Sequence, residues 1–167
     1  MSAGQINTVV PNEPMLDLYT VEVSYQGQSA PVLDIYGNPV NPGAFAVVNE
    51  DRTVNSQAHP AKPGSIVSVY ATGMDMFGVN FPDGQVVPLS PLLPLNFSLN
   101  GDSVTFAGIP GTILWEGSAP GYIFGLVQIN VQLPASLPPA SAATAVPMVI
   151  VSSYIFSSPA FPVFVAP

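Results

Sequence analysis

The sequence contains no cysteine, which excludes disulfide bonds, thiol nucleophiles and zinc–thiolate sites, so packing alone must hold the fold together. Basic residues are almost as scarce, since Arg52 and Lys62 are the only two among 167 residues. Two cations cannot neutralise the row of phosphates that nucleic acid or an anionic membrane presents. The composition therefore predicts a protein with no nucleic-acid partner.

Charge of either sign is sparse, at 7% of the residues, whereas hydrophobic residues make up 48%, and ten acidic residues give a formal net charge of −8. Such an apolar chain is unlike a disordered one, although it holds 20 prolines and 14 glycines. These residues separate short apolar runs, which indicates many turns and few long helices. No run reaches the roughly 20 apolar residues of a membrane-spanning helix, so we expect no membrane span.

Groups suited to catalysis are also few. His59 is the only histidine, so one chain cannot supply a Ser-His-Asp triad or a multi-histidine metal site. The carboxylates of Asp75, Asp83, Asp102 and Glu116 are scattered over expected loops and strand ends, where solvated acids are common. We therefore predict that the protein is not an enzyme and has no catalytic residue and no cofactor.

One acidic turn invites a metal interpretation. Asn49, Glu50, Asp51 and Asn55 offer the oxygen ligands that Ca²⁺ prefers, but their spacing fits no known calcium-binding loop such as the EF-hand. Solvated turn residues explain this pattern more simply. We predict no metal site.

Alternation of apolar and polar residues is the dominant pattern, and it is typical of half-buried strands. It is clearest at residues 20–25, 65–70 and 95–99, and it returns in shorter form at 103–107, 112–116, 123–133, 146–153 and 161–166. Gln26-Gly27 and Asn100-Gly101-Asp102 have the composition of tight hairpin turns. Prolines interrupt residues 135–145, which we expect to form a loop. The whole indicates an all-β, antiparallel β-sandwich.

A repeat is visible in the sequence. Residues 5–11 (QINTVVP) recur as residues 128–134 (QINVQLP), and a strand pattern follows both copies. The first copy lacks the strands that precede the second, so we expect the chain to open partway through a repeat unit. This gives three expected regions: N-terminal strands at 1–36, a Pro/Gly/Asn-rich connector at 37–63 that includes a short strand at 44–48, and a sandwich at 64–167.

Several separated motifs carry a family resemblance. They are VNEDRTVNS at 48–56, HPAKPGSIVSVYATG at 59–73, APG at 119–121, GLVQINV at 125–131 and LP at 133–134. In order and approximate spacing they resemble the uncharacterised immunoglobulin-like C-terminal repeat domain of secreted acidobacterial proteins. The family usually has Asp-Gly in the turn where this chain has Asp51-Arg52. The resemblance implies an immunoglobulin-like sandwich, an extracellular or cell-surface location and a modular, non-catalytic role.

The N-terminal strands provide the first functional hypothesis. Their apolar residues Ile6, Val9, Val10, Val21 and Val23 form strand faces that two or three isolated strands cannot bury. Either they pack on the sandwich of their own chain, or they complete a sheet of a neighbouring subunit by strand pairing. The second arrangement predicts a structural or adhesive protein that self-associates into a filament or surface array.

The aromatic residues provide the second hypothesis, a carbohydrate-binding module of a secreted system. Trp115 and Tyr122, with Phe124 nearby, are suited to form a platform for the rings of a polysaccharide. Alternatively, Trp115 continues the alternation of Ile113-Leu114-Trp115 and packs in the core. The sequence leaves both possibilities open.

Overall fold

The computed structural model describes residues 6, 8, 18–38, 40–74, 81–82, 84–95, 101–137, 143–153 and 155–166. Within these residues the chain is all-β and contains no helix, so none that could cross a membrane is found there. The chain divides into two compact units, Met1–Pro39 and Val40–Pro167, and each unit is described by itself.

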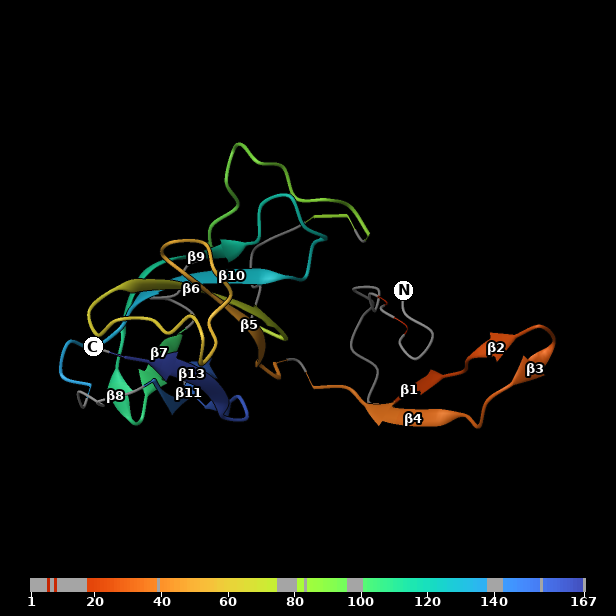
Figure 1. Ribbon diagram of the computed structural model, residues 1–167. Coiled ribbons are helices and arrows are strands. Elements are labelled where there is room, and N and C mark those ends of the chain that lie inside the picture. Colours follow the sequence, from red (N-terminus) through yellow and green to blue (C-terminus); the bar gives the residue numbers. More distant parts are fainter. Residues whose placement is uncertain are drawn as a thin grey trace. The chain divides into compact units, whose positions relative to one another are not determined.

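The larger unit contains two antiparallel sheets (Figure 1). The four-stranded sheet has the order β5 (Gly43–Asn49), β6 (Ile66–Thr72), β10 (Val127–Gln132) and β9 (Thr112–Ser118). The other sheet has the order β12 (Phe156–Ser157), β11 (Thr144–Ser152), β7 (Ser103–Phe106) and β8 (Ile109–Pro110), and β13 (Phe161–Val165) also pairs with β11.

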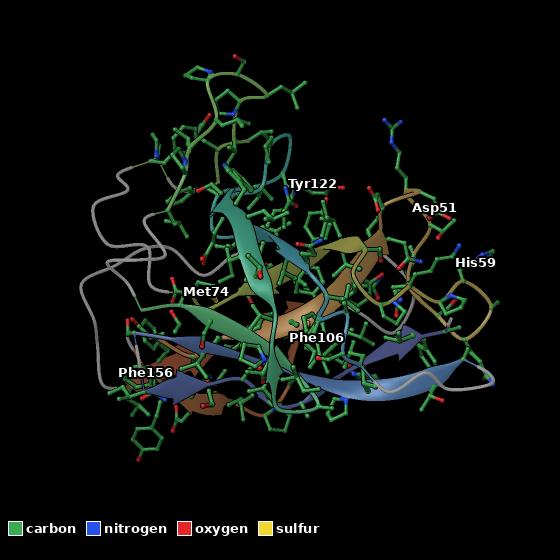
Figure 2. All side chains as sticks on the ribbon, turned by 90° about the vertical axis from the view of Figure 1, so that its left-hand side faces the viewer. Asp51, His59, Met74, Phe106, Tyr122 and Phe156 are labelled. Atoms are coloured by element: carbon green, nitrogen blue, oxygen red, sulfur yellow. The ribbon has the colours of Figure 1, made fainter. Side chains whose placement is uncertain are left out.

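One hydrophobic core joins the two sheets. Val67, Val69 and Ile129 contribute to it from the four-stranded sheet, and Phe106 and Ile150 contribute from the other. All five are fully buried, and Figure 2 shows Phe106 between the two layers. The expectation of an all-β protein with antiparallel sheets is confirmed, and the shared core is compatible with a β-sandwich.

The connector expected at 37–63 has a different structure from the one its composition indicates. Six of the seven residues of its strand β5 pair with β6, and Val47 lies in the core with only 2% of its surface exposed. The larger unit accordingly begins at Val40 and not at residue 64. The apolar run at 44–48 is short, and its pairing with a strand some twenty residues later is what incorporates it into the sheet.

A β-bulge interrupts strand β9. Ile113 lies opposite Val131 of β10, but Trp115 lies opposite the preceding residue, Asn130, so Leu114 is an extra residue in β9. A bulge of this kind shifts the alternation of side chains by one position. Beyond the bulge Glu116 lies opposite the buried Ile129, which places its side chain on the core face.

The N-terminal unit contains one long hairpin, which we call the N-terminal hairpin. Strand β1 (Leu18–Val21) pairs with β4 (Leu33–Tyr36), and β2 (Ser24–Tyr25) pairs with β3 (Gln28–Ser29). Gln26 and Gly27 form its turn with φ angles of 49° and 78°, which confirms the tight turn predicted there. In the second predicted turn, Gly101 also has a positive φ, of 66°, whereas Asn100 and the expected strand residues 96–99 lie outside the described residues.

Candidate functional site

The N-terminal hairpin has the same pairing scheme as the hairpin β11–β12–β13 of the sandwich, which we call the C-terminal hairpin. All six backbone pairs of the first have a counterpart in the second, with an offset of 127 residues before the turn and 128 after it. Val21 and Leu33, for example, correspond to Met148 and Phe161. A hydrogen bond between the two arms is also shared: the Ala30 N–H donates to the Val23 carbonyl over 2.8 Å, as Ser158 does to Ile150.

The two hairpins differ in what covers their apolar face. In the C-terminal hairpin Met148 and Ile150 are fully buried in the core. Their counterparts Val21 and Val23 remain 39% and 41% exposed, and the described residues of the N-terminal unit form no second layer above them. On the opposite face the Thr20 hydroxyl hydrogen-bonds to the Asp34 carboxylate, so the hairpin has one apolar and one more polar face.

The predicted assembly residues are only partly brought together. Val21 and Val23 lie on the apolar face of the N-terminal hairpin, whereas Ile6 is an exposed residue outside any strand. Val9 and Val10 lie outside the described residues. The pairing adds three residues to this face that the sequence analysis missed, namely Tyr19, Leu33 and Ile35. The alternation of Leu33 and Ile35 was a usable signal, but their partners could be found only from the pairing.

Trp115 does not pack in the core, contrary to the core alternative for this residue. The bulge at Leu114 places Trp115 opposite Asn130 on the outer side of the four-stranded sheet, where it is half-buried. Its indole lies over Gly117, because a Cβ atom at position 117 would come within 2.6 Å of the ring atom Cζ2. Glycine at this position therefore lets the indole lie along the sheet.

Tyr122 also lies on the outer side of the four-stranded sheet, away from Phe106 (Figure 2). Its ring centroid is 5.8 Å from that of Tyr70 on β6, and the two planes are tilted by 58°. Burial and the neighbouring Tyr122 raise the pKa of Tyr70, so its phenol stays neutral over the physiological range. Tyr70 was missed in the sequence analysis, although the core residues Val67 and Val69 of the same strand place it on the opposite face.

Amide groups lie between these aromatic residues. Ser68 donates a hydrogen bond to Asn130 Oδ1 over 2.9 Å, and Gln128 Nε2 donates to the same oxygen over 2.8 Å. Gln128 lies opposite Tyr70 on one side and Gly117 on the other. Ser68, Tyr70, Trp115, Gly117, Tyr122, Gln128 and Asn130 together form a surface that we call the outer face.

A second polar group lies inside the sandwich. Glu116 is only 1% exposed, and Asp102, the residue before β7, lies near its carboxyl group. Among the described residues, neither Glu116 oxygen has a hydrogen-bond partner in standard geometry, and the buried Ser118 hydroxyl has none either. The hydrogen bond between the Glu116 and Asp102 carboxyl groups, which contributes to the pKa, is therefore a loose one.

The environment of Glu116 favours its protonated form. Burial, followed by charge repulsion from Asp102 and their hydrogen bond, raises the pKa of Glu116 to about 8 from an ordinary value of 4.5. A carboxyl group that is 1% exposed cannot contact a substrate directly, so this pair does not form a surface active site. The sequence analysis assigned Glu116 to a solvated position, which is wrong because the bulge at Leu114 turns its side chain inward.

The acidic turn at 49–55 has a structural role in the described part of the chain. The Asn55 amide donates to the Phe164 carbonyl over 2.9 Å and accepts from the Phe164 N–H over 2.7 Å, so it acts as a short strand beside β13. Asn49 Oδ1 accepts a hydrogen bond from Asn55. Hydrogen bonds from the side chain and N–H of Thr53 lower the pKa of Asp51.

These asparagine oxygens are engaged within the protein and do not converge with the exposed carboxylates of Glu50 and Asp51. The described residues contain no group of three or more histidine or acidic side chains that could hold a metal ion. His59 is exposed at the end of the same loop, and its carbonyl accepts from the Asn49 amide over 2.8 Å. Asp75 and Asp83 lie outside the described residues.

Comparisons of the chain with protein families, with curated proteins and with solved structures give no significant match. The functional argument therefore depends on two surfaces of this chain, the apolar face of the N-terminal hairpin and the outer face of the sandwich.

Proposed function

We propose that this chain is a non-enzymatic structural or adhesive protein of the extracellular space or cell surface, and that it associates with further units of the same fold through the N-terminal hairpin. One observation carries the proposal. All six backbone pairs of the N-terminal hairpin recur in a hairpin that is part of the sandwich, yet the apolar face of the N-terminal hairpin is exposed.

The energetic argument follows from this comparison. A two-stranded hairpin is marginal in water, and its stability requires another layer on its apolar face. Val21, Val23, Leu33 and Ile35 are each about 40–60% exposed, so covering them contributes roughly 1 kcal/mol per side chain. The C-terminal hairpin indicates what kind of layer fits, because its counterpart residues pack against the four-stranded sheet of the same fold.

The strand order supports an immunoglobulin-like unit of the kind that the sequence motifs resemble. The order β5-β6-β10-β9 corresponds to strands A, B, E and D of the immunoglobulin fold, and β13-β11-β7 corresponds to strands G, F and C. In this scheme the N-terminal hairpin is an F–G hairpin that belongs to another such unit. The F and G positions of this chain's own sandwich are already filled by β11 and β13, so assembly consists of packing the apolar face of the N-terminal hairpin on a neighbouring unit.

The composition supports an extracellular setting. Two basic residues leave few sites for trypsin-like proteases, and the absence of cysteine removes sensitivity to redox conditions. A hairpin that packs on a different surface of the neighbouring unit makes a heterologous contact. A heterologous contact that does not close into a ring propagates into a filament or array.

The test is the oligomeric state of the full-length chain, measured by light scattering after size exclusion and by negative-stain electron microscopy. We expect concentration-dependent oligomers or filaments. Val21→Thr with Val23→Thr keeps the β-branched shape but replaces one methyl group of each side chain with a hydroxyl group, and it should weaken association by about tenfold or more. A chain that begins at Val40 should be a soluble monomer.

The matched control lies on the other face of the same hairpin. Leu18 and Tyr36 are also exposed, but they flank the more polar side, so Leu18→Thr with Tyr36→Thr should leave association unchanged. A full-length chain that stays monomeric at millimolar concentration contradicts the proposal, because the hairpin then folds back on its own chain. Assembly that survives in the chain beginning at Val40 contradicts it equally.

A further inference from the structure

The outer face combines two kinds of group in one row across the four-stranded sheet. Gly117, Gln128 and Tyr70 lie opposite one another on β9, β10 and β6. With strands about 4.8 Å apart, this row is roughly 10 Å long. The Trp115 indole lies over Gly117 at one end, and the Tyr70–Tyr122 ring pair forms the other end.

The polar groups of the row are held in a fixed arrangement. Asn130 Oδ1 accepts from both Ser68 and Gln128, which fixes the two amides with respect to each other. Within the described part of the chain this leaves Asn130 Nδ2 and Gln128 Oε1 without a protein partner, one a donor and the other an acceptor. Groups that are ordered before binding lose little conformational entropy when a ligand arrives.

This combination matches the chemistry of a sugar chain. A pyranose ring presents C–H groups on its faces, which pack against aromatic rings, and hydroxyl groups around its rim, which hydrogen-bond to amides. Aromatic groups separated by an amide pair along about 10 Å suit consecutive rings of a chain better than one isolated ring.

The charge of the surface narrows the class of ligand. None of the seven residues that form the outer face carries a charge at neutral pH, and the whole chain has a formal net charge of −8. A polyanion such as polygalacturonate would be repelled by this net charge and would find no cation on the face. A neutral polysaccharide is not repelled by the net charge and needs no cation on the outer face.

We propose that the outer face is a binding site for a neutral, linear polysaccharide, with Tyr70, Tyr122 and Trp115 packing against sugar rings and Gln128 and Asn130 hydrogen-bonding to hydroxyl groups. This function is independent of the hairpin, which lies in the other unit. The assembled protein would then bind polysaccharide through the outer face in addition to associating with itself through the hairpin.

The experiment is affinity gel electrophoresis of the full-length chain in gels that contain hydroxyethyl cellulose, mixed-linkage β-glucan or arabinoxylan. Polygalacturonate serves as the anionic comparison. We expect retardation in at least one neutral gel and none with polygalacturonate. Tyr122→Ala and Gln128→Ala should each lower the affinity by about threefold to tenfold.

The variants are chosen so that folding does not obscure the result. Tyr122 is 53% exposed, so its truncation leaves the core intact, and a thermal melt checks each variant. Tyr122→Phe keeps the ring and should retain binding. Tyr25→Ala removes a tyrosine that is 74% exposed on the N-terminal hairpin and should leave binding unchanged. The proposal is overturned by no retardation in all three neutral gels, or by retardation that persists unchanged in both Tyr122→Ala and Gln128→Ala.

Discussion

Replacing Glu116 with methionine should make the protein more stable at neutral and alkaline pH. Methionine has a similar length but no charge, so it fills the same space in the core without a carboxyl group that lacks well-aligned partners. The effect must depend on pH, because the folded state holds the Glu116 proton up to a pKa of about 8 whereas the unfolded chain releases it near 4.5.

The sign and size follow from this difference. A raised pKa means that the folded state binds more protons between pH 4.5 and 8, so the stability of the natural chain falls as pH rises through that window. Each pKa unit corresponds to about 1.36 kcal/mol, which gives a loss of roughly 3 kcal/mol at pH 7 and somewhat more above pH 8. For a chain of this size the methionine variant should melt on the order of 10 °C higher at pH 7.

The assay is urea unfolding between pH 5.5 and 9, followed by the fluorescence of Trp115, the only tryptophan. The free energy of unfolding should fall with pH in the natural chain and should vary much less in Glu116→Met. Glu50→Met changes an exposed turn carboxylate and serves as the control, with no change in slope. A natural chain whose stability is constant from pH 5.5 to 8, or a methionine variant that is less stable at pH 8, would refute this account.

Three further substitutions test the packing of loops against the sandwich. Asn55→Ala removes both hydrogen bonds to the Phe164 backbone and should cost about 2–3 kcal/mol in urea unfolding; a loss below 0.5 kcal/mol would show that water replaces the amide. Gly73→Ala should lower the stability by about 2–3 kcal/mol or more, because φ at this position is 70° and the new Cβ would collide with the Asn41 carbonyl oxygen. A thermal melt measures the loss, and an unchanged melting temperature would contradict this geometry. Arg52 has a φ of 69°, so Arg52→Gly should stabilise the turn by about 0.5 kcal/mol, and destabilisation would mean that the arginine side chain makes a compensating contact.

The strands could be predicted from the sequence where alternation is regular. Val67 and Val69 point to the core in β6, and the expected strand at 65–70 differs from the observed one only at its ends. The prediction that residues 37–63 form a connector missed that β5 is part of the sheet. The segment is short and lies among proline and glycine turns, and its place in the sheet depends on long-range pairing with β6 that local pattern cannot reveal.

In the candidate sites, too, the position of single residues depends on strand pairing that the local sequence pattern does not reveal. Alternation along β9 predicts that Ile113 and Trp115 share a face, but the extra residue Leu114 separates them. The sequence therefore named Trp115 and Tyr122 as a platform without indicating that Tyr70 completes it. Likewise, Val21 and Val23 were named for the N-terminal strands, whereas their partners across the hairpin depend on the register of pairing.

The bulge at Leu114 determines two properties at once, namely the outward position of Trp115 and the burial of Glu116. Because side chains alternate along a strand, a regular pairing that took up Leu114 opposite Asn130 would place Trp115 opposite Ile129 on the core face and would turn Glu116 outward. The bulged register of β9 thus sets both the aromatic side chain that the sheet presents outside and the carboxyl group that it encloses. A variant in which β9 pairs in regular register through Leu114 should lose the outward-facing tryptophan and the alkaline sensitivity together.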